Sequence, residues 1–404
     1  FKIKIMSKTV KIPVVKKELL FPFIIITSLF ALWGIANDLT NPMVSAFKKV
    51  MPELSNVQAS LVQFAFYFGY FFMALPAALF IRKYSYKSGI LLGLSLYAIG
   101  AFLFYPAASN QEFNYFLVSL WVITCGLAFL ETTSNPLILS LGVKETATQR
   151  LNLAQAFNPI GSLIGMIVAQ QFVISALRSD DKDANGVLVY DTLSETAKAA
   201  VRENDLSIIS IPYLILGLVV LAIMVIIIFT KIPKTAEEDK MSLSDSFKKL
   251  FSNKNYKYGV VAQAFYVGAQ IMCWTYVFQY VDNINEGLPE AENLTATWFN
   301  VAAMIIFLSG RWIGTILMKT INPSKILMLF GIGGVVFCAG AILINGIIGL
   351  YSLVAVSLFM SIMFPTIYGI ALKNMGDEAK IGSAGLVMAI VGGALLPILQ
   401  GWIL

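Results

Sequence analysis

Long apolar runs separated by short polar segments dominate this sequence. Eleven of them are long enough to cross a bilayer, because a spanning helix needs about 20 apolar residues. The runs cover residues 21–46, 57–81, 87–108, 115–141, 151–175, 207–230, 258–281, 295–318, 325–345, 349–371 and 382–404. The pattern therefore predicts an all-α, polytopic membrane protein.

The composition agrees with this prediction. Hydrophobic residues make up 58% of the chain, charged residues make up 13%, and the mean hydropathy is +0.77. Soluble domains carry about 25% charged residues. The net charge of +6 could suggest nucleic acid, but the basic residues lie in short loops instead of on one basic face. We expect the lipid bilayer as a partner and no nucleic acid.

The distribution of basic residues predicts the orientation and the domains. With a cytoplasmic N-terminus, 23 of the 29 Lys and Arg residues lie in inner segments, as the positive-inside rule requires. Residues 1–20 then form a cytoplasmic segment, 21–230 a six-helix bundle, 231–257 a cytoplasmic linker and 258–404 a second bundle. Only five apolar runs fall in the second bundle, so we expect a twelfth helix that this chain lacks.

An internal repeat supports the division into two bundles. Pro136 in the fourth run is followed eight residues later by Lys144, and Pro365 in the tenth run is followed by Lys373 at the same spacing. The pattern therefore repeats after six helices.

Two acidic residues lie well inside apolar runs, whereas the other 21 lie in loops or near helix ends. Asp38 precedes Leu-Thr-Asn-Pro in the first run, and Glu131 precedes Thr-Thr-Ser-Asn-Pro in the fourth. A charge at the bilayer centre costs roughly 2.5 to 3.5 kcal/mol, and a proline interrupts the helix ladder. This cost favours a functional role for both acids; the alternative is a buried hydrogen-bonded pair or a device that packs helices together.

The absence of histidine restricts the chemistry. A proton relay must depend on carboxylates, because no side chain titrates near neutrality without a perturbation. Cys125, Cys273 and Cys338 lie in separate apolar runs, so the sequence predicts neither a disulfide nor a metal site. We expect no cofactor and no enzymatic activity, since a catalytic constellation and a large extramembrane domain are both missing. A membrane enzyme or a receptor is the rival interpretation.

Amide and aromatic side chains on neighbouring apolar runs suggest a sugar site. Sugars stack their apolar faces on aromatic rings, while amides and carboxylates bind their hydroxyl groups. The candidate substrate-binding residues are Asn37, Asn41, Gln63, Tyr67, Asn135, Gln155, Asn158, Gln263, Tyr266, Gln270 and Trp274. The last four share one helical face. The alternative for the amides is that they simply hold helices together.

Four basic residues near the inner ends of apolar runs are candidate gating groups. They are Arg82, Lys83, Arg150 and Arg311. The positive-inside rule explains such positions without a gating role. Arg311 is different because it lies within an apolar run, where it needs an anionic or carbonyl partner.

Six stretches together resemble the fucose-galactose-hexose symporter family of the major facilitator superfamily. They are residues 31–37 (ALWGIAN), 63–70 (QFAFYFGY), 130–136 (LETTSNP), 150–158 (RLNLAQAFN), 266–270 (YVGAQ) and 364–367 (FPTI). The resemblance implies a major facilitator fold of two six-helix bundles with a sugar site between them. It also implies proton-driven import of a monosaccharide, L-fucose above all, by alternating access in a bacterial inner membrane. A monomer is expected, and a sodium-coupled or uncoupled carrier of galactose or glucose is the alternative.

The resemblance also implies roles for the two acids. The family's protonation carboxylate in the fourth helix falls on Glu131, which would take up a proton while it faces outward. The family's other carboxylate falls on Asn41, whereas this chain has its acid at Asp38. An offset of three residues keeps that acid on the same helical face, about 4.5 Å along the axis. Asp38 would bind sugar hydroxyls or share the proton.

Overall fold

The computed structural model describes residues 13–40, 42–183, 187–232, 242–289 and 292–403, so Asn41 lies outside the described residues. In chain order the α-helices are α1 (Leu20–Thr40), α2 (Met43–Val50), α3 (Asn56–Lys83), α4 (Tyr86–Phe102), α5 (Phe104–Asn110), α6 (Phe113–Ser140), α7 (Ala147–Gln155), α8 (Asn158–Val168), α9 (Val189–Thr192), α10 (Glu195–Phe229), α11 (Leu243–Ser252), α12 (Lys254–Asn285), α13 (Ala296–Leu317), α14 (Pro323–Leu343), α15 (Ile347–Met360), α16 (Met363–Ala371), α17 (Glu378–Met388) and α18 (Gly392–Ile403). Short helical turns are η1 (Lys17–Leu19), η2 (Lys144–Thr146), η3 (Ala169–Val173), η4 (Ile174–Ala176), η5 (Arg178–Asp180) and η7 (Ala389–Val391).

Eleven spans among the described residues are long and apolar enough to cross a membrane, and each overlaps one of the predicted runs. The predicted all-α, polytopic fold is thus confirmed. The sixth span begins earlier than residue 207, since α10 already starts at Glu195. Its first three turns are more polar than the apolar run, so the apolar pattern alone does not include them.

Side-chain caps fix where several helices begin. At the start of α3, the Gln58 N–H donates to the Ser55 hydroxyl and the Ser55 N–H donates to the Gln58 side chain, which is a capping box. Ser194, Asn253 and Asn322 cap α10, α12 and α14 in the same general way. These polar residues therefore end the loops between spans.

Five of the eleven spans are built from two consecutive helices: α1 with α2, α4 with α5, α7 with α8, α15 with α16, and α17 with α18. Prolines lie at or just after four of the breaks, namely Pro42, Pro106, Pro159 and Pro365. A proline has no N–H to donate to the carbonyl four residues earlier. The breaks thus leave backbone carbonyls that need other donors.

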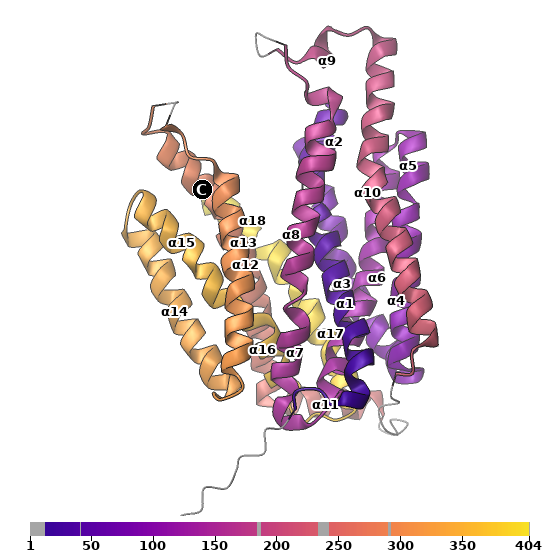
Figure 1. Cartoon of the computed structure of the whole chain (residues 1–404), viewed down its shortest axis with the longest axis vertical. Helices are drawn as coiled ribbons and strands as arrows, with labels where there is room; N and C mark the ends of the chain where they lie inside the picture. Colours follow the sequence, from indigo (N-terminus) through magenta and orange to yellow (C-terminus); the bar gives the residue numbers. More distant parts are fainter. Residues whose placement is uncertain (1–12, 41, 184–186, 233–241, 290–291, 404) are drawn as a thin grey trace, which may run out of the picture.

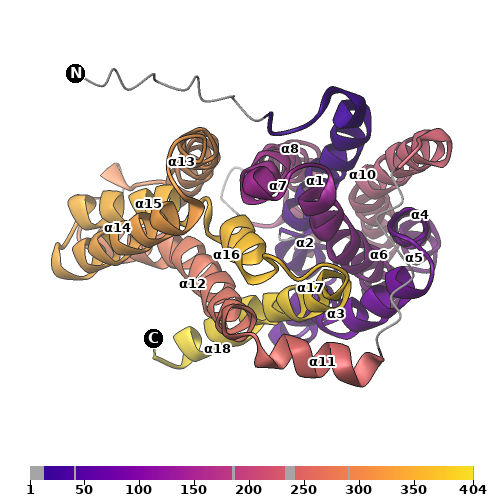
Figure 2. The same cartoon turned by 90° about the horizontal axis from the view of Figure 1, so that it is seen from below.

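The N-terminal half (α1 to α10) and the C-terminal half (α12 to α18) stand side by side (Figures 1 and 2). Within the N-terminal half, α1 packs tightly on α8. A Cβ added to Gly161 would lie 2.0 Å from the backbone oxygen of Ala31, and one added to Gly165 would lie 2.6 Å from that of Ile35. Only glycine lets these two backbones approach so closely.

The two halves meet mainly toward the end of the molecule that carries α11, which we call the α11 end. There α17 packs on α3 and α6, and α16 packs on α7. The ribbons of the halves diverge from this end toward the α9 end (Figure 1). Two hydrogen bonds from α7 cross between the halves: Gln149 Nε2 donates to the Thr315 carbonyl at 3.1 Å, and Asn152 Nδ2 donates to Thr366 Oγ1 at 3.1 Å.

Candidate functional site

A cavity of about 160 Å³ lies between the two halves. Helices α1, α3, α6, α7 and α8 supply one wall, and α12, α13, α16 and η7 supply the other. Its lining residues are Trp33, Asn37, Asp38, Phe66, Tyr67, Tyr70, Glu131, Gln155, Asn158, Pro159, Ser162, Val267, Gln270, Ile271, Trp274, Met304, Phe307, Arg311, Phe364 and Ile390. The cavity thus combines carboxylates, amides, one guanidinium group and aromatic rings.

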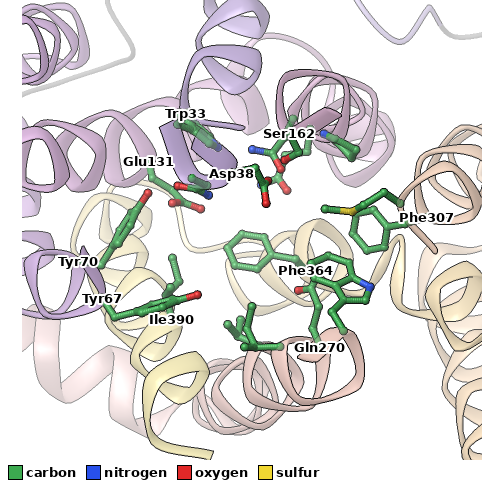
Figure 3. A pocket seen from close by; sticks show the side chains of 18 of the residues that line it. Trp33, Asp38, Tyr67, Tyr70, Glu131, Ser162, Gln270, Phe307, Phe364 and Ile390 are labelled. Carbon is green, nitrogen blue, oxygen red and sulfur yellow. The ribbon is translucent and has the colours of Figure 1, made fainter. Parts of the chain in front are cut away.

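Both intramembrane acids belong to this cavity. The carboxylates of Asp38 on α1 and Glu131 on α6 point into it (Figure 3). Glu131 is only 7% exposed, and no hydrogen bond or ion pair to its carboxylate occurs within the described residues. A carboxylate in such a place is costly when charged, so it is suited to gaining and losing a proton.

Two amides connect α6 to α7, Gln155 at the cavity and Asn135 behind its wall. Asn135 is fully buried, and its Nδ2 donates to the Glu131 backbone carbonyl at 3.0 Å. Gln155 Nε2 donates to Asn135 Oδ1 at 2.9 Å. These bonds fix the backbone on which the Glu131 side chain is mounted, and they leave its carboxylate free for other chemistry.

The opposite wall presents an indole ring and an amide. Trp274 Nε1 donates to Ser357 Oγ at 3.2 Å, and the indole packs edge-on against Phe307 with ring centroids 5.2 Å apart. Gln270 lies one turn away on α12, and no hydrogen bond to its amide occurs within the described residues. Across the cavity, Asn158 Nδ2 donates to the Phe30 carbonyl at 3.2 Å. The rings of the C-terminal wall are therefore held in place, while an amide beside them can bind a ligand.

The four candidate gating residues lie in different surroundings. Arg311 is buried at the cavity, where it donates to the backbone carbonyls of Gln155 and Ser361. Arg150 is also fully buried and donates to carbonyls at the end of α6, at Val14 and at Val143. All its partners lie in the N-terminal half or just before it.

The remaining two gating candidates, Arg82 and Lys83, form the last turn of α3 at the α11 end. The Lys83 ammonium lies over the ring of Tyr84, 5.3 Å from its centroid. Their place at an end of the span fits either a gating role or the positive-inside rule.

Several predicted substrate-binding residues do not line the cavity. Gln63, Asn135, Gln263 and Tyr266 lie outside the lining set, and Asn41 lies outside the described residues. The Tyr266 hydroxyl donates to the Met360 carbonyl at 2.9 Å. Gln263 is fully buried, and neither polar atom of its side chain has a partner in the described part of the chain. The structure brings the others together at the cavity: Asn37, Tyr67, Gln155, Asn158, Gln270 and Trp274.

Sequence reasoning missed eleven lining residues: Trp33, Phe66, Tyr70, Pro159, Ser162, Val267, Ile271, Met304, Phe307, Phe364 and Ile390. Helical spacing could have found some of them. Trp33 lies four residues before Asn37, and Ser162 lies four residues after Asn158, so each pair shares a helical face. The apolar members carry no such signal, because they resemble the lipid-facing residues around them.

The cysteines differ from the sequence prediction in one respect. Helices α12 and α14 bring the thiols of Cys273 and Cys338 near each other, although all three cysteines are free. Their separation of 65 residues hides this proximity from the sequence. Among the described residues, no group of three or more His, Cys, Asp or Glu side chains could hold a metal ion.

Comparison with known proteins decides the family. Residues 20–399 match the sequence model of the Major Facilitator Superfamily. The chain belongs to this superfamily. It is thus a multi-pass membrane protein of a transporter family, and the expected fold of two related bundles is confirmed.

Individual relatives extend this finding. The chain is 54% identical to the L-fucose-proton symporter of Haemophilus influenzae, over 97% of this chain and 90% of that protein. It is 33% identical to the glucose/galactose transporter of Brucella abortus, over 93% of this chain and 86% of that protein. The crystal structure of FucP in its outward conformation superposes with a TM-score of 0.85 at 34% identity, over 96% of this chain and 92% of that one.

Proposed function

We propose that this protein imports a monosaccharide together with a proton across the bacterial inner membrane by alternating access, and that its preferred substrate is L-fucose. The observation that carries the proposal is the cavity between the halves, where two carboxylates face amides and aromatic rings. Similarity to a relative named L-fucose-proton symporter supports the choice of sugar and of coupling ion.

The sugar would bind between the two walls of the cavity. Trp274 offers a flat apolar surface for one face of the sugar ring, while Gln270 and Asn37 offer amide groups for the hydroxyls. Asp38 lies at the same cavity and would accept hydrogen bonds from sugar hydroxyls or share the proton. Groups from both halves would then contact the same ligand, and the bound ligand would link the two halves.

The proton would bind at Glu131. Its carboxylate has no cationic partner in the described part of the chain, so its charge is costly in this surrounding. Protonation removes the cost and would let the loaded carrier close around the site. After the cavity opens on the other side, the proton and the sugar would leave together.

The contacts between the halves support an outward-facing state. The hydrogen bonds between the halves and the packing of α17 lie toward the α11 end, and the similar FucP structure is in an outward conformation. We propose that the α11 end is cytoplasmic, as the positive-inside rule predicts. The division into residues 1–20, 21–230, 231–257 and 258–404, the monomeric state, and gating by Arg82, Lys83 and Arg150 are part of this proposal.

Sugar-induced proton movement tests the proposal directly. The protein is reconstituted into lightly buffered, de-energised vesicles, and external pH is recorded after adding L-fucose, galactose or glucose. Alkalinisation of the medium with L-fucose supports proton symport, and vesicles without protein serve as the control. Transport of labelled L-fucose without a pH change would refute proton coupling. No pH change and no uptake with any of the three sugars would refute the substrate class.

A second candidate is a carrier of glucose or galactose that is sodium-coupled or uncoupled. The similarity to a glucose/galactose transporter favours it, and one acid with neighbouring amide oxygens could also bind sodium. Uptake of galactose that follows an imposed sodium gradient, with no response to a proton gradient, would establish this alternative.

A further inference from the structure

Arg311 is a buried cation whose hydrogen-bond partners are backbone carbonyls. Its side chain is 3% exposed, its Nε donates to the Ser361 carbonyl, and its Nη1 donates to the Gln155 carbonyl at 3.0 Å. The ring of Phe307 lies 4.6 Å from the guanidinium carbon. No carboxylate forms an ion pair with Arg311 in the described residues.

Each of these two carbonyls is four residues ahead of a proline. In a continuous helix the carbonyl of residue i accepts from the N–H of residue i+4. For Gln155 that residue is Pro159, and for Ser361 it is Pro365. Because proline has no N–H, neither carbonyl can find its usual partner in its own helix.

The two carbonyls belong to different halves of the protein. Gln155 ends α7 in the N-terminal half, whereas Ser361 lies in the break between α15 and α16 in the C-terminal half. A carbonyl without a donor inside a membrane protein costs several kcal/mol. The Arg311 guanidinium group can therefore donate to both carbonyls only while the two halves stay together at this position.

The same contact is connected to the candidate proton site. Gln155, whose carbonyl receives the Arg311 bond, uses its side chain to donate to Asn135. Asn135 in turn donates to the backbone carbonyl of Glu131. Beside the bridge, the rings of Phe157 and Trp312 meet edge-on across the halves, with centroids 5.9 Å apart.

We propose that Arg311 is a latch that keeps the α11 end closed by supplying donors to two proline-freed carbonyls, one in each half. Opening of that end would pull the Gln155 carbonyl away from the guanidinium group while Arg311 keeps its bond to Ser361. The role as a latch rests on the proposed alternating access, but the contact itself depends on neither the sugar nor the coupling ion.

Two substitutions test the latch from opposite sides. Arg311→Lys keeps the charge but loses the planar fork that reaches two carbonyls at once. Pro159→Ala leaves Arg311 in place and gives residue 159 an N–H, which can donate to the Gln155 carbonyl within the helix. Lys325→Gln is the matched control, because it removes an exposed cation from the same half.

Separation of the halves is measured by electron paramagnetic resonance between spin labels at residues 144 and 319. Both positions are exposed lysines toward the α11 end, and the three native cysteines are first replaced by alanine. We expect Arg311→Lys and Pro159→Ala each to raise the ratio of long to short distances about tenfold, as fits the loss of a charge-assisted hydrogen bond. The control should match the wild type.

Unchanged distances in both variants would overturn the proposal. Altered label distances in Arg311→Lys but not in Pro159→Ala would also overturn the proposal, because the proline-freed carbonyl of Gln155 would then play no part. If Arg311→Lys does not fold, the result for Pro159→Ala decides. The distances are recorded without sugar, and L-fucose transport by the wild type is assayed in parallel. Altered distances together with no transport would leave the latch standing and refute only the proposed function.

Discussion

Replacing Glu131 by Gln should abolish proton-driven accumulation of sugar and leave sugar exchange nearly intact. The substitution keeps the size of a side chain that is 7% exposed at the cavity, but glutamine cannot bind the transported proton. The neighbouring hydrogen bond from Asn135 goes to the Glu131 backbone, so it survives the change. The variant thus removes a proton site with little change in the shape of the wall.

The expected magnitude follows from the number of carboxylates at the cavity. One proton moving down a gradient of about one pH unit releases about 1.4 kcal/mol, which supports a tenfold sugar gradient. If Asp38 also carried a proton, two would move and the sugar gradient would be about a hundredfold. The Glu131→Gln variant should stay near a ratio of one if Glu131 is the coupling site.

The assay uses proteoliposomes with the membrane potential clamped at zero and an acidic medium outside. Labelled L-fucose inside the vesicles is measured at steady state, and exchange of internal for external sugar is measured without a pH gradient. Asp38→Asn is assayed in parallel. If only Glu131 carries the proton, the Asp38→Asn variant should accumulate any sugar that it still binds about tenfold, as the wild type does.

Accumulation by Glu131→Gln well above a ratio of one would refute the reasoning, because the sugar would then be driven without this proton site. Loss of exchange together with accumulation would point to a structural role for the acid. A wild-type ratio near a hundredfold that falls to tenfold in Asp38→Asn would instead assign one proton to each carboxylate.

Three further predictions concern the surroundings of the site. Arg150→Met should lower the free energy of unfolding by about 4 kcal/mol in a thermal-unfolding assay, because buried carbonyls lose a charged donor. Lys144→Met, the control at an exposed position, should have little effect. Gly161→Ala should lower the free energy of unfolding by about 1 to 3 kcal/mol, since its Cβ would lie 2.0 Å from a backbone oxygen of α1. Gly331→Ala on α14 is the control and should leave stability unchanged, because its Cβ would meet nothing within 4 Å. Trp274→Ala should raise the sugar concentration for half-maximal exchange about tenfold, and an unchanged value would exclude stacking on this ring.

The number and type of spans could be predicted from the sequence, because each span needs a long apolar run and the bilayer allows few other solutions. The breaks inside the spans were harder to predict. Pro159 indicates a weak point in the fifth span, yet Pro136 lies inside the unbroken helix α6. Whether a proline breaks a helix or is tolerated depends on the donors that neighbouring helices supply, and the local sequence does not contain them.

The candidate site could be predicted in part, for a similar reason. Charge at membrane depth identifies Asp38 and Glu131 from the sequence alone, because such a charge is costly wherever it faces. An amide carries less information, since it can line a cavity, as Gln270 does, or lie fully buried behind the wall, as Asn135 and Gln263 do. The difference depends on how α6 and α12 rotate against their neighbours, which residue spacing within one helix cannot fix.

The strength of the contacts between the halves fits a protein that must open and close. Three residue pairs form hydrogen bonds across the halves at or near the α11 end, namely Gln149 with Thr315, Asn152 with Thr366, and Arg311 with Gln155. No ion pair between described residues joins the halves. Two neutral bonds and one charge-assisted bond are together worth about 4 kcal/mol. Moving a two-state equilibrium from 1:99 to 99:1 takes about 5.5 kcal/mol. Binding of one sugar and one proton can supply a difference of this size, so the hydrogen bonds between the halves are weak enough for the loaded carrier to break them.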